Sequence, residues 1–163
     1  IGDFERISDH AAGIAMAYGK MKEKELTFSA KAQEELEIFS RAVLRMLAIS
    51  EGIFREENAD SLYEAQALRE VIGELGAQVR KRHVKRLRKG KCTVELGFLL
   101  ADIVTAYERI AAHCAQIAVS VVQVWEEDSM EMHGYSIESR EKRRDEEQFR
   151  TLYEGLRQEY VLP

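Results

Sequence analysis

Apolar residues recur along the chain at alternating steps of three and four, which places them on one face of an α-helix. The pattern predicts five helices, over residues 1–24, 28–54, 61–90, 96–124 and 139–160. In the last and shortest of these, Phe149, Leu152 and Leu156 form the face that we expect to dock on the others. The connections are short, so neighbouring helices should run antiparallel.

Residues with known preferences for helix ends support these boundaries. Ser61 followed by Glu64 is a candidate capping box, Gly90 is a candidate left-handed cap, and Thr93 is a candidate N-cap. The polar stretch EEDSMEMHGYS, residues 126–136, separates the fourth helix from the last one. The sequence therefore predicts a linker over 127–138.

One phrase occurs twice, as IGDFERISDH at residues 1–10 and as VTAYERIAAH at 104–113. Adding 103 to each number superimposes the two apolar faces, with Phe4 on Tyr107 and Ile7 on Ile110. Such a duplication indicates an internal repeat of three helices. Residues 27–126 would form one complete repeat, and residues 1–24 would be the last helix of a preceding one.

Composition narrows the class of protein. The chain has 163 residues, is 45% hydrophobic and carries its one proline at the last position, which favours a single all-α antiparallel bundle. Cys92 and Cys114 show no metal-binding spacing, and no apolar run is long enough to cross a membrane. The chain begins inside a helical pattern without Met, which suggests a fragment of a longer protein.

The acidic side chains offer candidate metal ligands. Glu5 and Asp9 lie four residues apart, so both occupy one helical face, on the side away from Phe4 and Ile7. Two such carboxylates can share a hard or borderline cation. The alternative is a solvated face on which Arg6 neutralises Asp9.

A second chemical alternative is a di-metal carboxylate enzyme. It would need Glu and Glu-x-x-His ligands pointing into the bundle, whereas His113 follows Glu108 by five residues. No nucleophile–base arrangement or glycine-rich phosphate loop is present. We therefore expect a protein that is not an enzyme. His10 and His113, at equivalent repeat positions, are expected to be satisfied polar groups at a helix interface.

Three segments together resemble the PhoU-like cytoplasmic domain of bacterial sodium-dependent phosphate cotransporters: GDFERISDHAAGIA, RHVKRLRKGKCTVELGFLLADIVTAYERIAAHCAQIA and DEEQFRTLYEGLRQEY. The resemblance implies two three-helix repeats, each with a Glu/Asp-x-x-x-Asp signature that can hold metal on the bundle surface. It also implies negative regulation of phosphate uptake. The implied partner is the transmembrane transporter portion of the same polypeptide, and the implied location is the cytoplasmic face of the inner membrane.

The resemblance implies a divalent or iron-type ion at the repeat signatures. Glu5 and Asp9 match the signature in the first copy, and Glu108 matches in the second. Ala112, however, stands where the family usually has Asp, and Gly73 stands where it often has an acid. We therefore expect metal binding by the second copy to be impaired.

The stretch RKRHVKRLRKGK places eight Lys or Arg residues within 80–91. It could meet an anionic membrane surface or simply be a solvated helix end. Without interleaved aromatics for base stacking, we expect no nucleic acid. The candidate membrane contacts are Arg80, Lys81, Lys85, Arg86, Arg88 and Lys89.

Three functional classes remain open: a regulatory domain of a phosphate transporter, a di-metal carboxylate enzyme, and a purely structural helical module. The first helix would lack the other two helices of its own repeat, which would leave Phe4, Ile14 and Met21 partly uncovered. Either the last helix or a second copy of the chain should cover them. We expect a homodimer.

Overall fold

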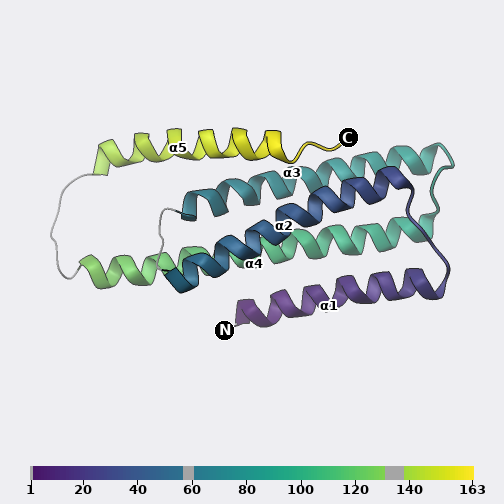
Figure 1. Cartoon of the computed structure of the whole chain (residues 1–163), viewed down its shortest axis with the longest axis horizontal. Helices are drawn as coiled ribbons and strands as arrows, with labels where there is room; N and C mark the ends of the chain where they lie inside the picture. Colours follow the sequence, from purple (N-terminus) through teal and green to yellow (C-terminus); the bar gives the residue numbers. More distant parts are fainter. Residues whose placement is uncertain (1, 57–60, 131–137) are drawn as a thin grey trace.

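The computed structural model describes residues 2–56, 61–130 and 138–163, without the side chains at 56, 125–130 and 138–145. Within these ranges it contains five α-helices and no strand (Figure 1). They are α1 (Gly2–Glu23), α2 (Ala30–Glu56), α3 (Ser61–Arg88), α4 (Val94–Met130) and α5 (Glu138–Glu159). Consecutive helices run in opposite directions, and the predicted all-α antiparallel bundle is confirmed.

The end of α4 differs from the prediction. The helix continues through Met130, past the point where the linker 127–138 was expected to begin. Residues 127–130 are mostly polar but include neither glycine nor proline, and polar residues do not by themselves stop a helix. The remainder of the polar stretch, 131–137, lies outside the described residues.

The turn between α3 and α4 has glycine where the backbone requires it. Gly90 has a φ of 64°, and its N–H donates to the carbonyl of Leu87 at 3.0 Å. The N–H of Lys91 donates to the carbonyl of Arg86 at 2.9 Å, which completes a Schellman motif. The hydroxyl of Thr93 then accepts the N–H of Leu96 at 3.2 Å and opens α4. Both predicted caps are confirmed.

The predicted capping box at the start of α3 does not form as expected. Ser61 does begin the helix. The carboxylate of Glu64, however, accepts two hydrogen bonds from Arg45 of α2, at 2.9 and 2.6 Å. This pairing ties α2 to α3 instead of closing the first turn.

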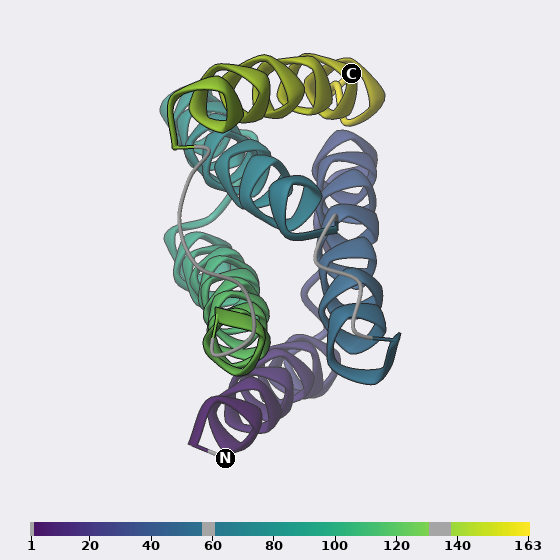
Figure 2. The ribbon, with the colours of Figure 1, turned by 90° about the vertical axis from the view of Figure 1, so that its left-hand side faces the viewer.

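The helix α4 occupies the centre of the bundle, because α1, α2 and α3 all pack on it (Figure 2). The rings of Phe39 and Tyr107 meet edge to face with centroids 5.1 Å apart. Each large apolar side chain buried here stabilises the fold by roughly 1.5–3 kcal/mol. The largest fully buried side chains come from α2, α3 and α4: Phe39, Met46, Ile53, Leu68, Ile72, Leu75, Leu100 and Ile103.

The first helix lies at one edge of the bundle and packs on α4. Met21 is buried in the core, so the expectation that it would be left uncovered is wrong. Ile7 and Ile14 are partly buried, whereas Phe4 and Tyr18 of the predicted apolar face are 51% and 43% exposed. Among the described helices only α4 packs closely against α1, so α1 buries a narrower apolar face than its sequence offers.

The last helix packs on α3, at the edge of the bundle opposite α1 (Figures 1 and 2). Leu156 is buried, and Phe149 and Leu152 are partly buried against the core, as predicted. Glu74 of α3 accepts a hydrogen bond from the hydroxyl of Tyr153 and forms an ion pair with Arg157, whose Nε lies 3.3 Å from Oε2. The exposed side of α1 is therefore not covered by α5.

Replacing Gly90 or Gly73 with alanine should change the free energy of unfolding in opposite directions. Gly90→Ala should lower the free energy of unfolding by about 1 kcal/mol, because a Cβ disfavours positive φ. Gly73→Ala should raise it by about 0.5–1 kcal/mol, since Gly73 is an exposed helical residue with open space around it. Urea denaturation of both variants provides the measurement. A stabilised Gly90→Ala variant would contradict the described turn.

Candidate functional site

The acidic pair predicted on the first helix lies on its outer surface. Glu5 and Asp9 are both exposed. Asp9 lines a shallow hollow of about 330 Å³ between α1 and α4, together with His10, Asp102 and Thr105. Among the described residues, no three or more His, Cys, Asp or Glu side chains are grouped so that they could hold a metal ion.

Glu108, the third predicted ligand, is engaged by a cation from the protein itself. Arg80 of α3 donates to both of its carboxylate oxygens, each at 2.6 Å. This bond to Glu108 is the main reason that the pKa of Arg80 is raised. Glu108 lies directly over Gly76, where a Cβ would come within 2.1 Å of Oε1. The structure thus places Glu108 in an α3–α4 ion pair.

Sequence reasoning did not identify Arg80 as the partner of Glu108. The available signal was Gly76, which lies four residues before Arg80 on the same face of α3. A glycine inside a long helix costs about 1 kcal/mol relative to alanine, which suggests a packing reason for its presence. The sequence alone does not say which side chain from another helix uses that space.

The equivalent histidines of the two repeat phrases meet across the α1–α4 interface. The rings of His10 and His113 are stacked with centroids 5.7 Å apart. Nδ1 of His113 lies 2.8 Å from Oδ1 of Asp3, so the expectation of a satisfied polar group is confirmed there. Burial, followed by the nearby His113 and Arg109, lowers the pKa of His10. The repeat equivalent of Asp3 is Ala106, which offers His10 no matching carboxylate.

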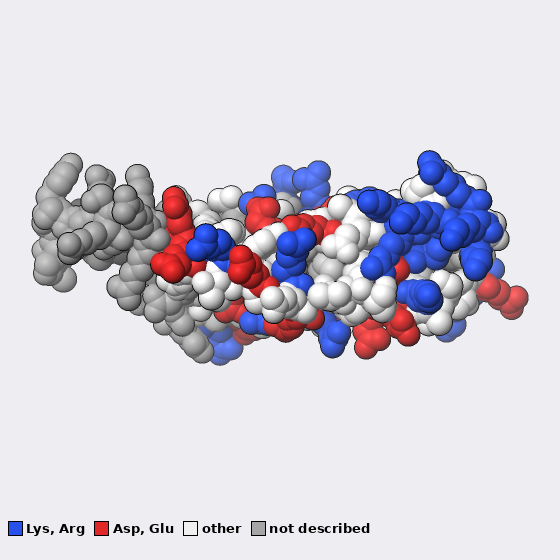
Figure 3. Space-filling view, turned by 90° about the horizontal axis from the view of Figure 1, so that it is seen from above, with Lys and Arg blue, Asp and Glu red and all other residues white. Residues whose placement is uncertain are grey.

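Basic side chains gather at the end of the bundle that contains the end of α3 and the beginning of α2 (Figure 3). Lys81, Lys85, Arg88 and Lys89 are exposed. Arg80, as shown above, is bound to Glu108. The predicted basic surface is therefore real, but not all of its members point freely to solvent.

Glu35 gathers two arginines of α3 into a buried ion cluster. Its side chain is 3% exposed and pairs with Arg86 through two hydrogen bonds of 2.8 Å. Arg82 lies 3.3 Å from the same carboxylate and also donates to the carbonyls of Leu162 and Pro163. This cluster joins α2, α3 and the segment after α5 at the basic end.

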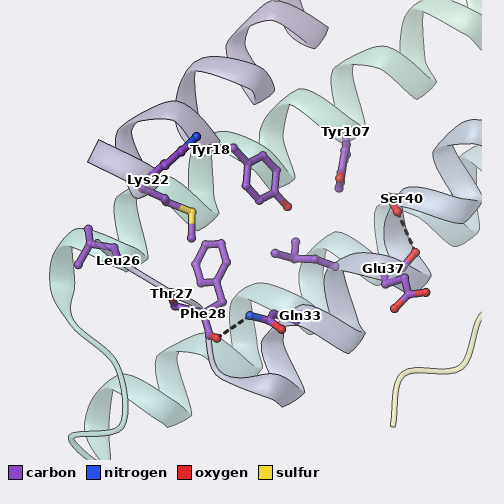
Figure 4. A pocket seen from close by; sticks show the side chains of 11 residues that line it. Tyr18, Lys22, Leu26, Thr27, Phe28, Gln33, Glu37, Ser40 and Tyr107 are labelled. Atoms are coloured by element: carbon purple, nitrogen blue, oxygen red, sulfur yellow. Dashed lines mark hydrogen bonds between the residues drawn. The ribbon is translucent and has the colours of Figure 1, made fainter. Parts of the chain in front are cut away.

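A hollow of about 520 Å³ opens between α1, the α1–α2 connection, α2 and α4 (Figure 4). Its walls combine apolar side chains such as Phe28 with the hydroxyls of Tyr18, Ser40 and Tyr107. Burial raises the pKa of Tyr18, and it raises that of Tyr107 to about 12. Both phenols are therefore neutral near pH 7. They can donate or accept hydrogen bonds, but they do not supply a base.

No helix in the described ranges combines the length and the apolar character needed to cross a bilayer. The surface features described so far are the outward acidic pair, the basic end and the hollow that contains the hydroxyls of Tyr18, Ser40 and Tyr107.

Comparison with known proteins shows which family the sequence matches. The model of the family described as PhoU domain matches residues 36–121, from α2 through most of α4. The phosphate-specific transport system accessory protein PhoU homolog 1 of Thermotoga maritima is 25% identical over 122 residues. That alignment covers 75% of this chain and 52% of the relative, so the chain spans about half the relative's length.

No solved structure matches the chain significantly. The family match, in contrast, extends over more than half of the sequence and includes all of α3 together with most of the central helix α4. The PhoU-like character expected from the sequence is confirmed: the chain belongs to the PhoU family.

Proposed function

We propose that this chain is a cytoplasmic regulatory domain that lowers phosphate uptake by a sodium-dependent transporter, whose transmembrane portion belongs to the same polypeptide. The observation that carries the proposal is the PhoU match across α2, α3 and α4. The relative from Thermotoga maritima is named as an accessory protein of phosphate-specific transport, which supports a phosphate-related regulatory role. The sodium-dependent context rests on the sequence resemblance.

Such a regulator acts by binding one transporter state better than another, because a ligand shifts an equilibrium only through differential affinity. The described surface offers apolar side chains for protein contacts. Phe4 of α1 and Leu44 and Phe54 of α2 are each more than half exposed. Together with Ile7 and Leu47 they line a hollow of about 420 Å³.

The basic end gives the domain a way to lie against the inner leaflet. Each Lys or Arg near an anionic membrane surface contributes about 1 kcal/mol. Lys81, Lys85, Arg88 and Lys89 are exposed and available for this contact. Arg80 and Arg86, which were also expected to contribute, are already paired with carboxylates and should contribute less.

The residues present do not fit a tightly held metal ion. Glu5 and Asp9 provide two exposed carboxylates, whereas cations such as Ca²⁺ take six or more oxygen ligands. Glu108 is neutralised by Arg80, and Ala112 adds no oxygen ligand beside it. Any ion at the acidic pair would be weakly bound, and the proposed regulation does not depend on it.

The regulatory role can be tested by phosphate uptake into vesicles. Removing residues 1–163 from the full polypeptide should raise uptake without abolishing it, because the domain biases the transporter instead of forming the pathway. Adding the separate chain back serves as the control. Unchanged uptake over a range of phosphate and metal concentrations would exclude the regulatory role, and complete loss would point to a structural one.

Restoring the missing Asp of the second signature, at Ala112, should increase metal binding. Ala112→Asp should raise the affinity for Mn²⁺ or Ni²⁺ several-fold, because it restores a carboxylate four residues after Glu108. Calorimetric titration of the variant and the parent chain measures the change. Adding Arg80→Gln should raise affinity further, since it frees Glu108. Equal affinities in all three proteins would show that the family signature does not extend to residues 108–112.

We also propose that the exposed apolar surface of α1 and α2 mediates homodimer formation. Phe4 and Phe54 already contact each other edge to face, with ring centroids 5.8 Å apart. Sedimentation at high micromolar concentration should show a dimer, and Leu44→Glu should shift the chain towards monomer. Val161→Glu, which charges an exposed apolar residue after α5, is the matched control. A parent chain that remains monomeric would refute the proposal.

A further inference from the structure

Another hollow lies at the basic end, between the first turn of α2, the last turns of α3 and the α3–α4 turn. It measures about 440 Å³ and is lined by Ser29, Ala30, Lys31, Lys85, Arg86, Lys89 and Lys91. Five of these seven residues are cationic, and no carboxylate is among them. The hollow therefore differs from the surrounding basic surface, because basic side chains from two helices and a turn line one recess, largely with their aliphatic parts.

The backbone of the α3–α4 turn positions two of these lysines. The Schellman motif at Gly90 holds the segment containing Lys89 and Lys91 against the end of α3. The same motif occupies the carbonyls of Arg86 and Leu87, which would otherwise present negative charge to a ligand. Lys31 approaches from α2, on the other side of the recess.

The beginning of α2 adds uncharged donors. The N–H groups of Ala30 and Lys31 belong to the first turn of the helix, where no carbonyl is available one turn earlier. The hydroxyl oxygen of Ser29 accepts the N–H of Ala32 at 3.4 Å, so its own O–H remains able to donate. A helix N-terminus of this kind favours an anion.

Arg86, which lines the hollow, gives separate evidence for a ligand atom there. Its terminal nitrogens are used by Glu35, but its buried Nε has no hydrogen-bond partner in the described part of the chain. Unpaired buried donors are rare because they cost free energy. Arg86 is one of the residues that line the hollow, so an oxygen atom bound there is a candidate for the missing acceptor.

We propose that this hollow binds a phosphoryl oxyanion. A phosphate group carries several acceptor oxygens and up to two negative charges, which suit lysine ammonium groups, a serine hydroxyl and helix N–H donors. The same chemistry is offered by free inorganic phosphate and by a phosphomonoester lipid headgroup. The site goes beyond the regulatory role proposed above and does not rest on it, since binding is measured on the chain alone.

The test compares two charge-matched double variants. Lys31→Gln with Lys91→Gln removes two cations from the hollow, whereas Lys81→Gln with Arg88→Gln removes two exposed cations of α3 that do not line it. Inorganic phosphate is titrated into each protein and into the parent at about 150 mM salt, where diffuse surface attraction is screened. Amide chemical shifts of Ala30, Lys31 and Lys91 report occupancy of the hollow.

The first variant should bind phosphate roughly tenfold more weakly than the parent, because each charged hydrogen bond that is lost weakens binding. The second should change the affinity by less than about twofold. Equal weakening in both variants would overturn the site in favour of diffuse attraction.

Vesicles distinguish the two sources of the group. Phosphatidylcholine vesicles containing phosphatidic acid carry a phosphomonoester, whereas those containing phosphatidylglycerol at the same surface charge do not. Preferential binding to phosphatidic acid without binding of inorganic phosphate would assign the hollow to a lipid headgroup. Saturable binding of inorganic phosphate that depends on Lys31 and Lys91 would assign it to the free ion. Failure of both, with neither phosphate binding nor lipid preference, would overturn the proposal.

Discussion

The fold depends on the burial of α4 against three helices at once. Its buried positions fall in adjacent pairs, such as Val104 with Ile103 and Ala111 with Ile110, which widens the apolar face beyond the single stripe of an edge helix. Alanines among them allow neighbouring helices to approach closely. Once α4 is enclosed, α2 and α3 are fixed relative to each other, and α5 can only add to the outside of α3.

Local chemistry explains why much of this architecture could be read from the sequence. Helix positions follow from periodicity, and Gly90 and Thr93 act on the backbone within a few residues of themselves. The orientation of α1 could not be read in the same way. Periodicity fixes the spacing of an apolar face, but the partner helices decide which part of it is buried, and Phe4 remains half exposed.

For the candidate site residues too, local features could be predicted from the sequence, whereas contacts between helices could not. The outward position of Glu5 and Asp9 followed from their spacing relative to Phe4 and Ile7. The engagement of Glu108 did not, because it depends on the register of α3 against α4 and on the space that Gly76 leaves. Pairing between helices is a tertiary property, and a single sequence without contacts does not specify it.

At the basic end, neighbouring cationic residues of α3 have different environments in the fold, although the sequence does not distinguish them. Arg82 and Arg86 turn inward to Glu35, while the neighbouring lysines remain outside. Arginine suits the inner position because its planar guanidinium can bind a carboxylate through two hydrogen bonds. Removing one member of such a buried pair leaves an uncompensated charge and is strongly destabilising. These two arginines therefore have a structural task, whereas the lysines are free to meet other molecules.

The stacking of His10 on His113 gives the α1–α4 contact a local symmetry. The two rings occupy the same position of the duplicated phrase, and their helices run antiparallel (Figure 1). A contact in which one element meets its own duplicate at the same residue is self-complementary, as in an isologous interface with two-fold symmetry. The two-fold relation is broken close by, because Asp3 contacts His113 at 2.8 Å whereas Ala106 offers His10 no carboxylate.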